Sequence, residues 1–189
     1  GFGVAPRLNA AGRLTHASIA VELLLATDKQ TARQKALYLD EENKQRQEIV
    51  EDIFHEAVKK IEENNLQKNK IIIVVGENWH EGVIGIVASK LSNAHKKPAF
   101  IFSIHNGIAK GSARANANIN LYDVITKAKH LLLGYGGHKN AAGLSLDASN
   151  LEEFKTIINE ELENSKEDLH IEPITLGELD VSSVDLDFI

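Results

Sequence analysis

The sequence predicts an α/β protein in which a mixed β-sheet is flanked by helices and preceded by one long connector helix. Residues 71–75 are an unbroken run of Ile and Val, which is typical of a strand buried on both faces of a sheet and favours a parallel neighbour. An Asn-Gly pair at residues 106–107 separates two strand-like segments and predicts an antiparallel hairpin. Residues 28–66 contain neither glycine nor proline, and their apolar stripe indicates a long helix.

The N-terminal third is expected to link two packed bodies. Residues 1–27 begin with a segment rich in Gly, Pro, Asn and Arg, which predicts a loop, and continue into a short buried helix over residues 19–25. Within the long helix, residues 40–48 are wholly polar and the apolar stripe lies beyond them. This pattern predicts a connector helix whose middle is exposed to solvent.

The remaining elements alternate between helix and strand. Residues 82–91 predict a helix whose two glycines favour close packing against the preceding strand. Asn120 is a good N-cap, and the helix that it starts is expected to run to Leu133 and to end at Gly134. Further along, a strand is expected over residues 141–146, an amphipathic helix over 151–162, and the start of another domain over 171–189.

Composition excludes several classes of function. The chain has 189 residues, 43% of them hydrophobic and 25% charged, and it contains no cysteine, so disulfides, thiolate metal sites and cysteine nucleophiles are excluded. No apolar run is long enough to span a bilayer and no signal-peptide pattern is present, so we expect a cytoplasmic protein without a membrane partner. The chain begins with Gly1 and contains no methionine, so we expect it to be part of a longer protein.

Charge is segregated along the chain. The net charge is −6, yet residues 90–140 carry eight Lys or Arg and one acid, whereas residues 141–189 carry two basic and thirteen acidic residues. A ligand responds to the local field within a screening length of roughly 10 Å, so the basic block favours an anionic ligand.

Three segments offer groups that bind anions. Residues 134–143 are dense in glycine and are expected to form a turn in which the amides of Gly136 and Gly137 build a phosphate nest beside His138. The alternative is a helix C-cap followed by an ordinary turn. Two further segments carry arginines that suit phosphate oxygens: Arg7 and Arg13 in residues 6–13, and Arg114 with Ser112 in residues 110–114. The alternative for these arginines is a solvated surface or a salt bridge at a helix N-cap.

Residues 79–85 follow the first buried strand, at the end where open α/β sheets place their ligands. His80 is expected either to contact a phosphate or to cap the helix that follows, and Trp79 either to stack on a base or to pack between elements. The sequence has no Asp/His cluster at metal-ligand spacing, no Ser-His-Asp signature and no Walker loop. The chain is therefore expected to bind a substrate without cleaving it.

Taken in order, three segments resemble RecJ-type single-strand-specific DNA exonucleases of the DHH phosphoesterase superfamily. They are residues 6–13, residues 76–89 with the Trp-His pair, and residues 136–143 with the pattern Gly-Gly-His-Lys-Asn-Ala-Ala-Gly. The resemblance implies a 5′-to-3′ exonuclease of DNA repair and recombination that uses Mn²⁺ or Mg²⁺ held outside this chain. It also implies that this chain alone is inactive. Glu81 and Ala113 depart from the family pattern, which has proline and glycine there.

The same resemblance implies a division of the chain and a set of ligand contacts. The expected parts are the end of the DHH catalytic domain (1–27), the connector helix (28–68), the DHH-associated domain (69–165) and the beginning of an OB-fold (166–189). Expected partners are single-stranded DNA, the rest of the catalytic domain in cis, and a single-strand-binding protein or helicase. The residues expected to hold DNA are Arg7, Arg13, His80, Ser112, Arg114, Gly136, Gly137 and His138.

Two other functions fit the same residues. One is a smaller DHH-family phosphodiesterase that acts on oligonucleotides or cyclic dinucleotides, which would share the glycine-histidine segment. The other is a non-catalytic protein-interaction domain whose acidic C-terminus binds a basic partner.

Overall fold

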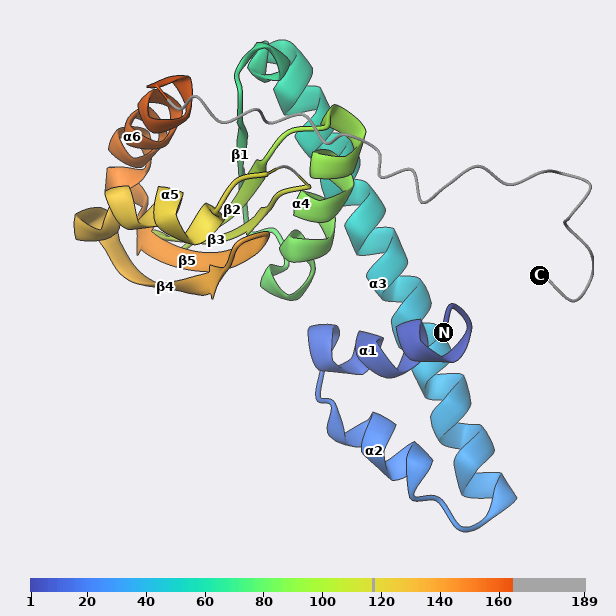
Figure 1. Ribbon diagram of the computed structural model, residues 1–189. Helices are drawn as coiled ribbons and strands as arrows, with labels where there is room; N and C mark the ends of the chain where they lie inside the picture. The colour runs from blue at the N-terminus through green and yellow to red at the C-terminus, as the bar shows by residue number, and fades with distance from the viewer. Residues whose placement is uncertain (117, 165–189) are drawn as a thin grey trace, which may run out of the picture.

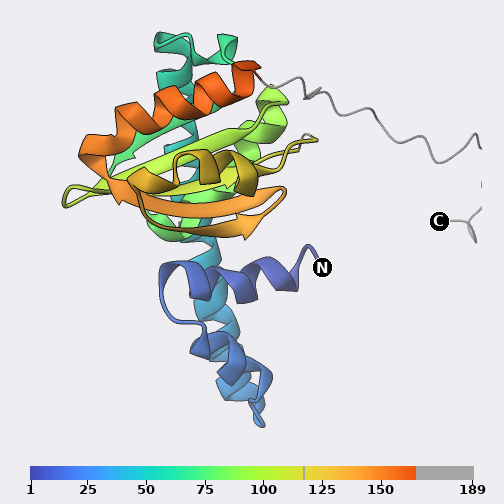
Figure 2. The same cartoon turned by 60° about the vertical axis from the view of Figure 1, so that its left-hand side comes forward.

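The computed structural model describes residues 1–116 and 118–164, which form a helical N-terminal part and a sheet-containing part joined by one long helix (Figure 1). The N-terminal part comprises α1 (Val4–Leu14), α2 (Ser18–Leu24) and the first half of α3 (Lys29–Glu63). Figure 2 shows α1 and α2 on one side of the molecule and the sheet on the other, with α3 running through both. The expected connector is confirmed as a helix, whereas the predicted start of an OB-fold lies outside the described residues.

The loop predicted at the start of the chain is wrong, because residues 4–14 form α1. Pro6 occupies the first turn, where the missing N–H costs no intrahelical hydrogen bond. Ala10 and Ala11 are fully buried against neighbouring helices, and this burial overrides the loop-like composition. The helix expected next is present as α2, but it is not buried, since Leu24 is 69% exposed and only Ala20 of α2 is buried.

The prediction that the middle of α3 is exposed to solvent is also wrong in part. Asp28 caps this helix by accepting a hydrogen bond from the Thr31 N–H (2.8 Å), and the apolar stripe of its second half is buried as predicted. In the polar middle, however, Glu42 and Asn43 are buried, and Thr15 donates a hydrogen bond to the Glu42 carboxylate (3.1 Å). The N-terminal segment packs against α3 here, a contact that the polarity of the sequence did not indicate.

The sheet has five strands in the order β1-β2-β3-β5-β4. Strands β1 and β2 are parallel and every other pair is antiparallel, so the predicted mixed sheet is confirmed. Asn106 and Gly107 have φ angles of 49° and 79° and form the predicted hairpin turn between β2 and β3. The elements of this part are β1 (Ile72–Glu77), α4 (Glu81–His95), β2 (Ala99–His105), β3 (Ile108–Arg114), α5 (Leu121–Lys127), β4 (Leu132–His138), β5 (Ala141–Asp147) and α6 (Leu151–Asn164), with short 3-10 turns at Leu66–Lys68, Lys129–Leu131 and Ala148–Asn150.

Helices cover both faces of the sheet. On one face, α3 and α4 bury Ile72, Val74 and Ile101. On the other face, α5 and α6 enclose a core that includes Phe100, Phe102 and Phe154. No helix among the described residues is long and apolar enough to cross a membrane.

The structure corrects the prediction for the glycine segment. Helix α5 begins at the Asn120 cap as predicted, but it ends at Lys127 rather than at Leu133, and Gly134, Gly136 and Gly137 belong to strand β4. Gly137 has a φ of 151°, and a Cβ there would lie 2.4 Å from the Ala141 carbonyl oxygen. Gly137 therefore serves close pairing of β4 with β5, and the three glycines lie in a strand. They do not form a turn after a helix, and no helix dipole acts on them.

Trp79 depends on a glycine of β1 for its place in the core. It is 6% exposed, and a Cβ on Gly76 would lie 2.0 Å from its Cε2 atom. We expect Gly76→Ala to lower the free energy of unfolding by about 3 kcal/mol, at the upper end of the cost of overpacking. Gly136→Ala is the matched control, because nothing lies within 4 Å of its added Cβ, and it should change the value by less than about 0.5 kcal/mol. Urea unfolding followed by tryptophan fluorescence measures both, and equal stabilities of the two variants would contradict this packing.

Candidate functional site

Arg114 and Ser112 project from β3 toward the N-terminal half of α4. The Arg114 Nη1 group donates to Ser112 Oγ (3.0 Å) and to the Ala113 carbonyl oxygen (2.7 Å). A Cβ on Gly85 of α4 would lie 2.9 Å from Arg114 Nη2 and 3.0 Å from Ser112 Oγ. The glycine therefore leaves room for the guanidinium group between helix and strand.

Arg13 reaches the same region from the end of α1. Its Nη1 group donates to the Gly82 carbonyl oxygen (3.1 Å) in the first turn of α4. A Cβ on Gly82 would lie 2.1 Å from the Arg13 carbonyl oxygen, so only glycine allows α1 and α4 to meet this closely. A hollow of about 410 Å³ lies at this junction, lined by Leu8, Asn9, Gly12, Arg13, Ala17 and Gly82.

A third arginine, Arg46 of α3, lies near Arg13, and the sequence alone did not point to it. Its Nη2 group donates to Asn43 Oδ1 (3.1 Å), whereas its Nε atom is buried without a partner. It lies in the polar middle of α3, where a charged residue is typical of a solvated helix surface. No local signal distinguishes it, because its partial burial depends on packing against α3 in the folded chain.

These three arginines, which we call the arginine cluster, influence one another electrostatically. Burial, and then the positive charge of Arg13, lower the pKa of Arg114 below its usual value. The same two causes lower the pKa of Arg46. Among the described residues, no carboxylate forms an ion pair with any member of the cluster. Positive charge that is partly buried and unpaired favours binding of an anion.

Beside the arginine cluster, the sheet exposes Gly136 and Gly143, and we call this part of the sheet the glycine-floored surface. Antiparallel pairing places Ser112 opposite Gly143, which is itself opposite Gly136. In the neighbouring row, Arg114 lies opposite Ala141, and Ala141 opposite His138. Partners in register share a face of the sheet. Along this face lies an open hollow of about 460 Å³ lined by residues that include Glu81, Ile84, Lys110, Ser112, Gly134, Gly143 and Ser145.

Strand register thus places Ser112, Arg114, Gly136 and His138 on one face of the sheet, and Arg13 lies near enough to Arg114 to lower its pKa. Gly137 belongs to the opposite face of the sheet, because successive residues of a strand alternate between faces, and it is in register with Ala142. The departure noted at Glu81 is partly neutralised, because its carboxylate pairs with Lys110 Nζ at 2.7 Å.

Arg7 and His80 have other partners. The Arg7 Nε group donates to Asp40 Oδ1 (2.7 Å), and this hydrogen bond is the main cause that lowers the pKa of Asp40. His80 Nδ1 accepts a hydrogen bond from the Gly82 N–H (3.2 Å), so His80 caps α4, as one of the two alternatives predicted. Trp79 packs between elements rather than offering a stacking surface, and its Nε1 group donates to Glu56 Oε2 (2.8 Å).

Within residues 1–116 and 118–164, no group of three or more His, Cys, Asp or Glu side chains is arranged to hold a metal ion. The guanidinium, hydroxyl and imidazole groups of this surface are hydrogen-bond donors that suit an anion.

Comparison with known proteins places the chain in a family. Residues 67–164 match the family model of the DHHA1 domain. The chain is 38% identical over 167 residues to the single-stranded-DNA-specific exonuclease RecJ of Bacillus subtilis, covering 87% of this chain and 21% of the relative. It is 36% identical to RecJ of Haemophilus influenzae, covering 99% of this chain and 34% of the relative. The chain thus spans between a fifth and a third of these relatives.

Solved structures agree with this assignment. The crystal structure of RecJ from Thermus thermophilus in complex with Mn²⁺ matches with a TM-score of 0.78 and 34% identity, over 88% of this chain and 24% of that one. A manganese-bound exonuclease RecJ matches with a TM-score of 0.78 over 41% of its length, and a Mg²⁺ complex of the Thermus protein is also similar. The resemblance found in the sequence is confirmed: the chain belongs to the DHHA1 domain family and is homologous to RecJ exonucleases over most of its length.

Proposed function

We propose that this chain is the strand-holding segment of a single-stranded-DNA-specific exonuclease that works from the 5′ end toward the 3′ end. The observation that carries this proposal is the arginine cluster, whose three guanidinium groups converge from α1, α3 and β3 without a carboxylate partner among the described residues. A DNA phosphate supplies the missing negative charge. Its oxygens accept hydrogen bonds from Arg13 and Arg114, and the Ser112 hydroxyl adds a further donor.

The glycine-floored surface supports a path for the strand beyond that phosphate. Gly136 and Gly143 are exposed and carry no side chain, so a sugar-phosphate backbone can approach the sheet closely. His138 lies farther along β4, and Lys139 follows it with its Nζ group bonded to Asn118 Oδ1 (2.9 Å). Lys139 adds positive charge, and His138 an imidazole group, at one end of the surface.

We further propose that residues 1–27 pack against the catalytic part of the longer protein. Large apolar side chains are exposed there and on the adjoining part of α3, which is typical of an interface whose partner is missing. The most exposed are Phe2, Val4, Leu24, Leu25 and Leu37. In this division of labour, Mn²⁺ or Mg²⁺ held by that partner activates water for hydrolysis, and the present chain positions the DNA.

Arg114→Ala tests the phosphate contact directly. We expect it to weaken binding of a fluorescein-labelled single-stranded oligonucleotide by about 1–3 kcal/mol, and to reduce the slope of log Kd against log salt by about 0.7. Lys127→Ala is the matched control, since it also removes one positive charge but lies on α5, paired with Glu161 (3.1 Å). Fluorescence anisotropy at several salt concentrations measures both variants. Unchanged binding by Arg114→Ala would remove this residue from the site.

Gly85→Ala separates binding from stability. Alanine favours the helix by about 1 kcal/mol, and the new Cβ meets only the ends of the Arg114 and Ser112 side chains. The free energy of unfolding should therefore stay the same or rise, while DNA binding weakens because the guanidinium group is displaced. Combining it with Arg114→Ala should give little further loss of affinity, since both changes act on one contact. Fully additive losses would contradict this arrangement.

Removal of divalent metal should leave DNA binding unchanged, because the proposed contacts are made by arginine, serine and histidine side chains. We expect equal Kd values in EDTA and in Mn²⁺, and no release of nucleotides from a labelled strand under either condition. Hydrolysis by the purified chain in Mn²⁺, abolished by EDTA, would overturn the proposed division of labour.

A further inference from the structure

Strand β1 is an edge strand, and one of its edges is unpaired. It pairs with β2 alone, at the end of the sheet opposite to β4. The Ile72 N–H donates to the Pro98 carbonyl oxygen (2.9 Å) and the Asn78 N–H to the Ile104 carbonyl oxygen (3.0 Å). Main-chain groups alternate in direction along a strand, so the N–H and C=O groups of Ile73, Val75 and Glu77 point to the open edge.

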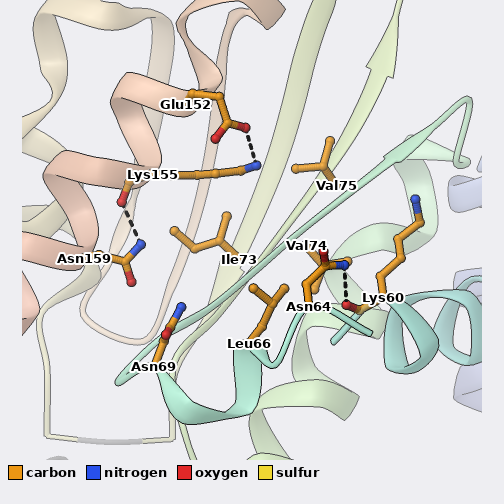
Figure 3. Close-up of a pocket in the computed structure, with 10 residues that line it drawn as sticks. All are labelled: Lys60, Asn64, Leu66, Asn69, Ile73, Val74, Val75, Glu152, Lys155 and Asn159. Atoms are coloured by element: carbon orange, nitrogen blue, oxygen red, sulfur yellow. Dashed lines mark hydrogen bonds and ion pairs between the residues drawn. The ribbon is translucent and has the colours of Figure 1, made fainter. Parts of the chain in front are cut away.

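A groove runs along this open edge. Its volume is about 340 Å³, and Figure 3 shows its walls, which come from the end of α3 on one side and from α6 on the other. The apolar part of the groove is formed by Leu66, Ile73 and Val75. Among the described residues, no main-chain or side-chain group is hydrogen-bonded to Ile73 or Val75 at this edge. The groove therefore offers unpaired main-chain donors and acceptors beside apolar surface.

Lysines make this groove more positive than negative. Its charged lining residues are Lys60 on α3 and Lys155 and Glu152 on α6. Lys155 Nζ lies 2.6 Å from Glu152 Oε1, and Lys60 Nζ lies 3.5 Å from Glu56 Oε1. The two carboxylates are 84% and 50% exposed, respectively, so these pairs contribute little and are easily exchanged for other partners.

We propose that the open edge of β1 binds an extended acidic segment of a partner protein, which pairs with β1 as a further strand of the sheet. Its main chain would bond to the outward-facing groups of Ile73 and Val75. Its side chains would alternate between the α3 wall and the α6 wall, because successive residues of a strand face opposite sides of a sheet. Each wall carries one lysine of the groove, so an acidic side chain can be accommodated on either side.

An alternative role of lysines beside an edge strand is to prevent aggregation through edge-to-edge pairing, without binding any partner. A protective lysine need not leave an apolar hollow beside the strand, whereas this groove keeps Val75 half-buried and accessible from the edge. The hollow, the unpaired main chain and the positive charge coincide, which favours recognition of a strand.

The test uses the chain described here and a fluorescein-labelled peptide of about ten residues that alternates valine with aspartate, long enough to span the edge. We expect the peptide to bind in an anisotropy titration, and the matched peptide with lysine in place of aspartate not to bind. NMR-detected hydrogen exchange should show new protection of the Ile73 and Val75 amides. The amide of Val74, which already faces β2, should be unchanged.

Charge reversal on the groove wall provides the matched variants. Lys155→Glu should weaken peptide binding at least about tenfold, because it places a like charge beside the acidic segment. Lys59→Glu changes a nearby exposed residue of α3 that does not line the groove, and it should change binding less than about twofold.

Three results would overturn the proposal: no binding of the acidic peptide, binding without protection of Ile73 and Val75, or equal losses in the two charge-reversal variants. Protection of these amides without peptide, accompanied by a dimer in analytical ultracentrifugation, would instead assign the edge to a second copy of the chain.

Discussion

The close approach of α4 to both α1 and β3 is the contact on which the proposed site depends. Gly82 lies against the Arg13 main chain, and Gly85 lies against the ends of Ser112 and Arg114. A side chain at Gly82 would push α4 away from the α1 main chain, whereas one at Gly85 would displace the ends of the Arg114 and Ser112 side chains. Helix α4, which packs on β2 and β3, is thus also the element that Arg13 and Arg114 both approach, although they are far apart in the sequence.

The arginine cluster lacks the carboxylate partners that other positive side chains of the described residues have. Arg7 has Asp40 as a partner, and Lys110 has Glu81, so these positive charges are balanced locally. In the cluster, burial and mutual repulsion lower the pKa values of Arg46 and Arg114 instead. Such repulsion opposes folding, and an arrangement that persists in spite of it is typical of a functional site. A bound phosphate would convert the unfavourable interaction into a favourable one.

The sheet keeps its two proposed binding regions apart. The surface around Ser112, Gly136 and Gly143 lies toward the β4 end of the sheet, whereas the open edge of β1 lies at the other end. A DNA strand and a protein segment would therefore not compete for the same residues.

The sequence by itself determined the features that local physics controls. Uninterrupted helix formers over residues 28–66, the Ile and Val run of β1, the Asn106-Gly107 turn and the Asn120 cap all have short-range causes, and the structure confirms each of them. Ser112 and Arg114 were predictable as neighbours for the same reason, since alternate residues of a strand share one face.

Tertiary packing decided what local patterns left open. Helix α1 forms where Ala10 and Ala11 are buried, and the glycines of β4 lie in a strand because β4 pairs with β5. Packing on α3 buries the Nε atom of Arg46, although the polar sequence around this residue is typical of an exposed helix surface. Each of these outcomes depends on residues far away in the sequence, so it follows from the assembled fold rather than from any local pattern.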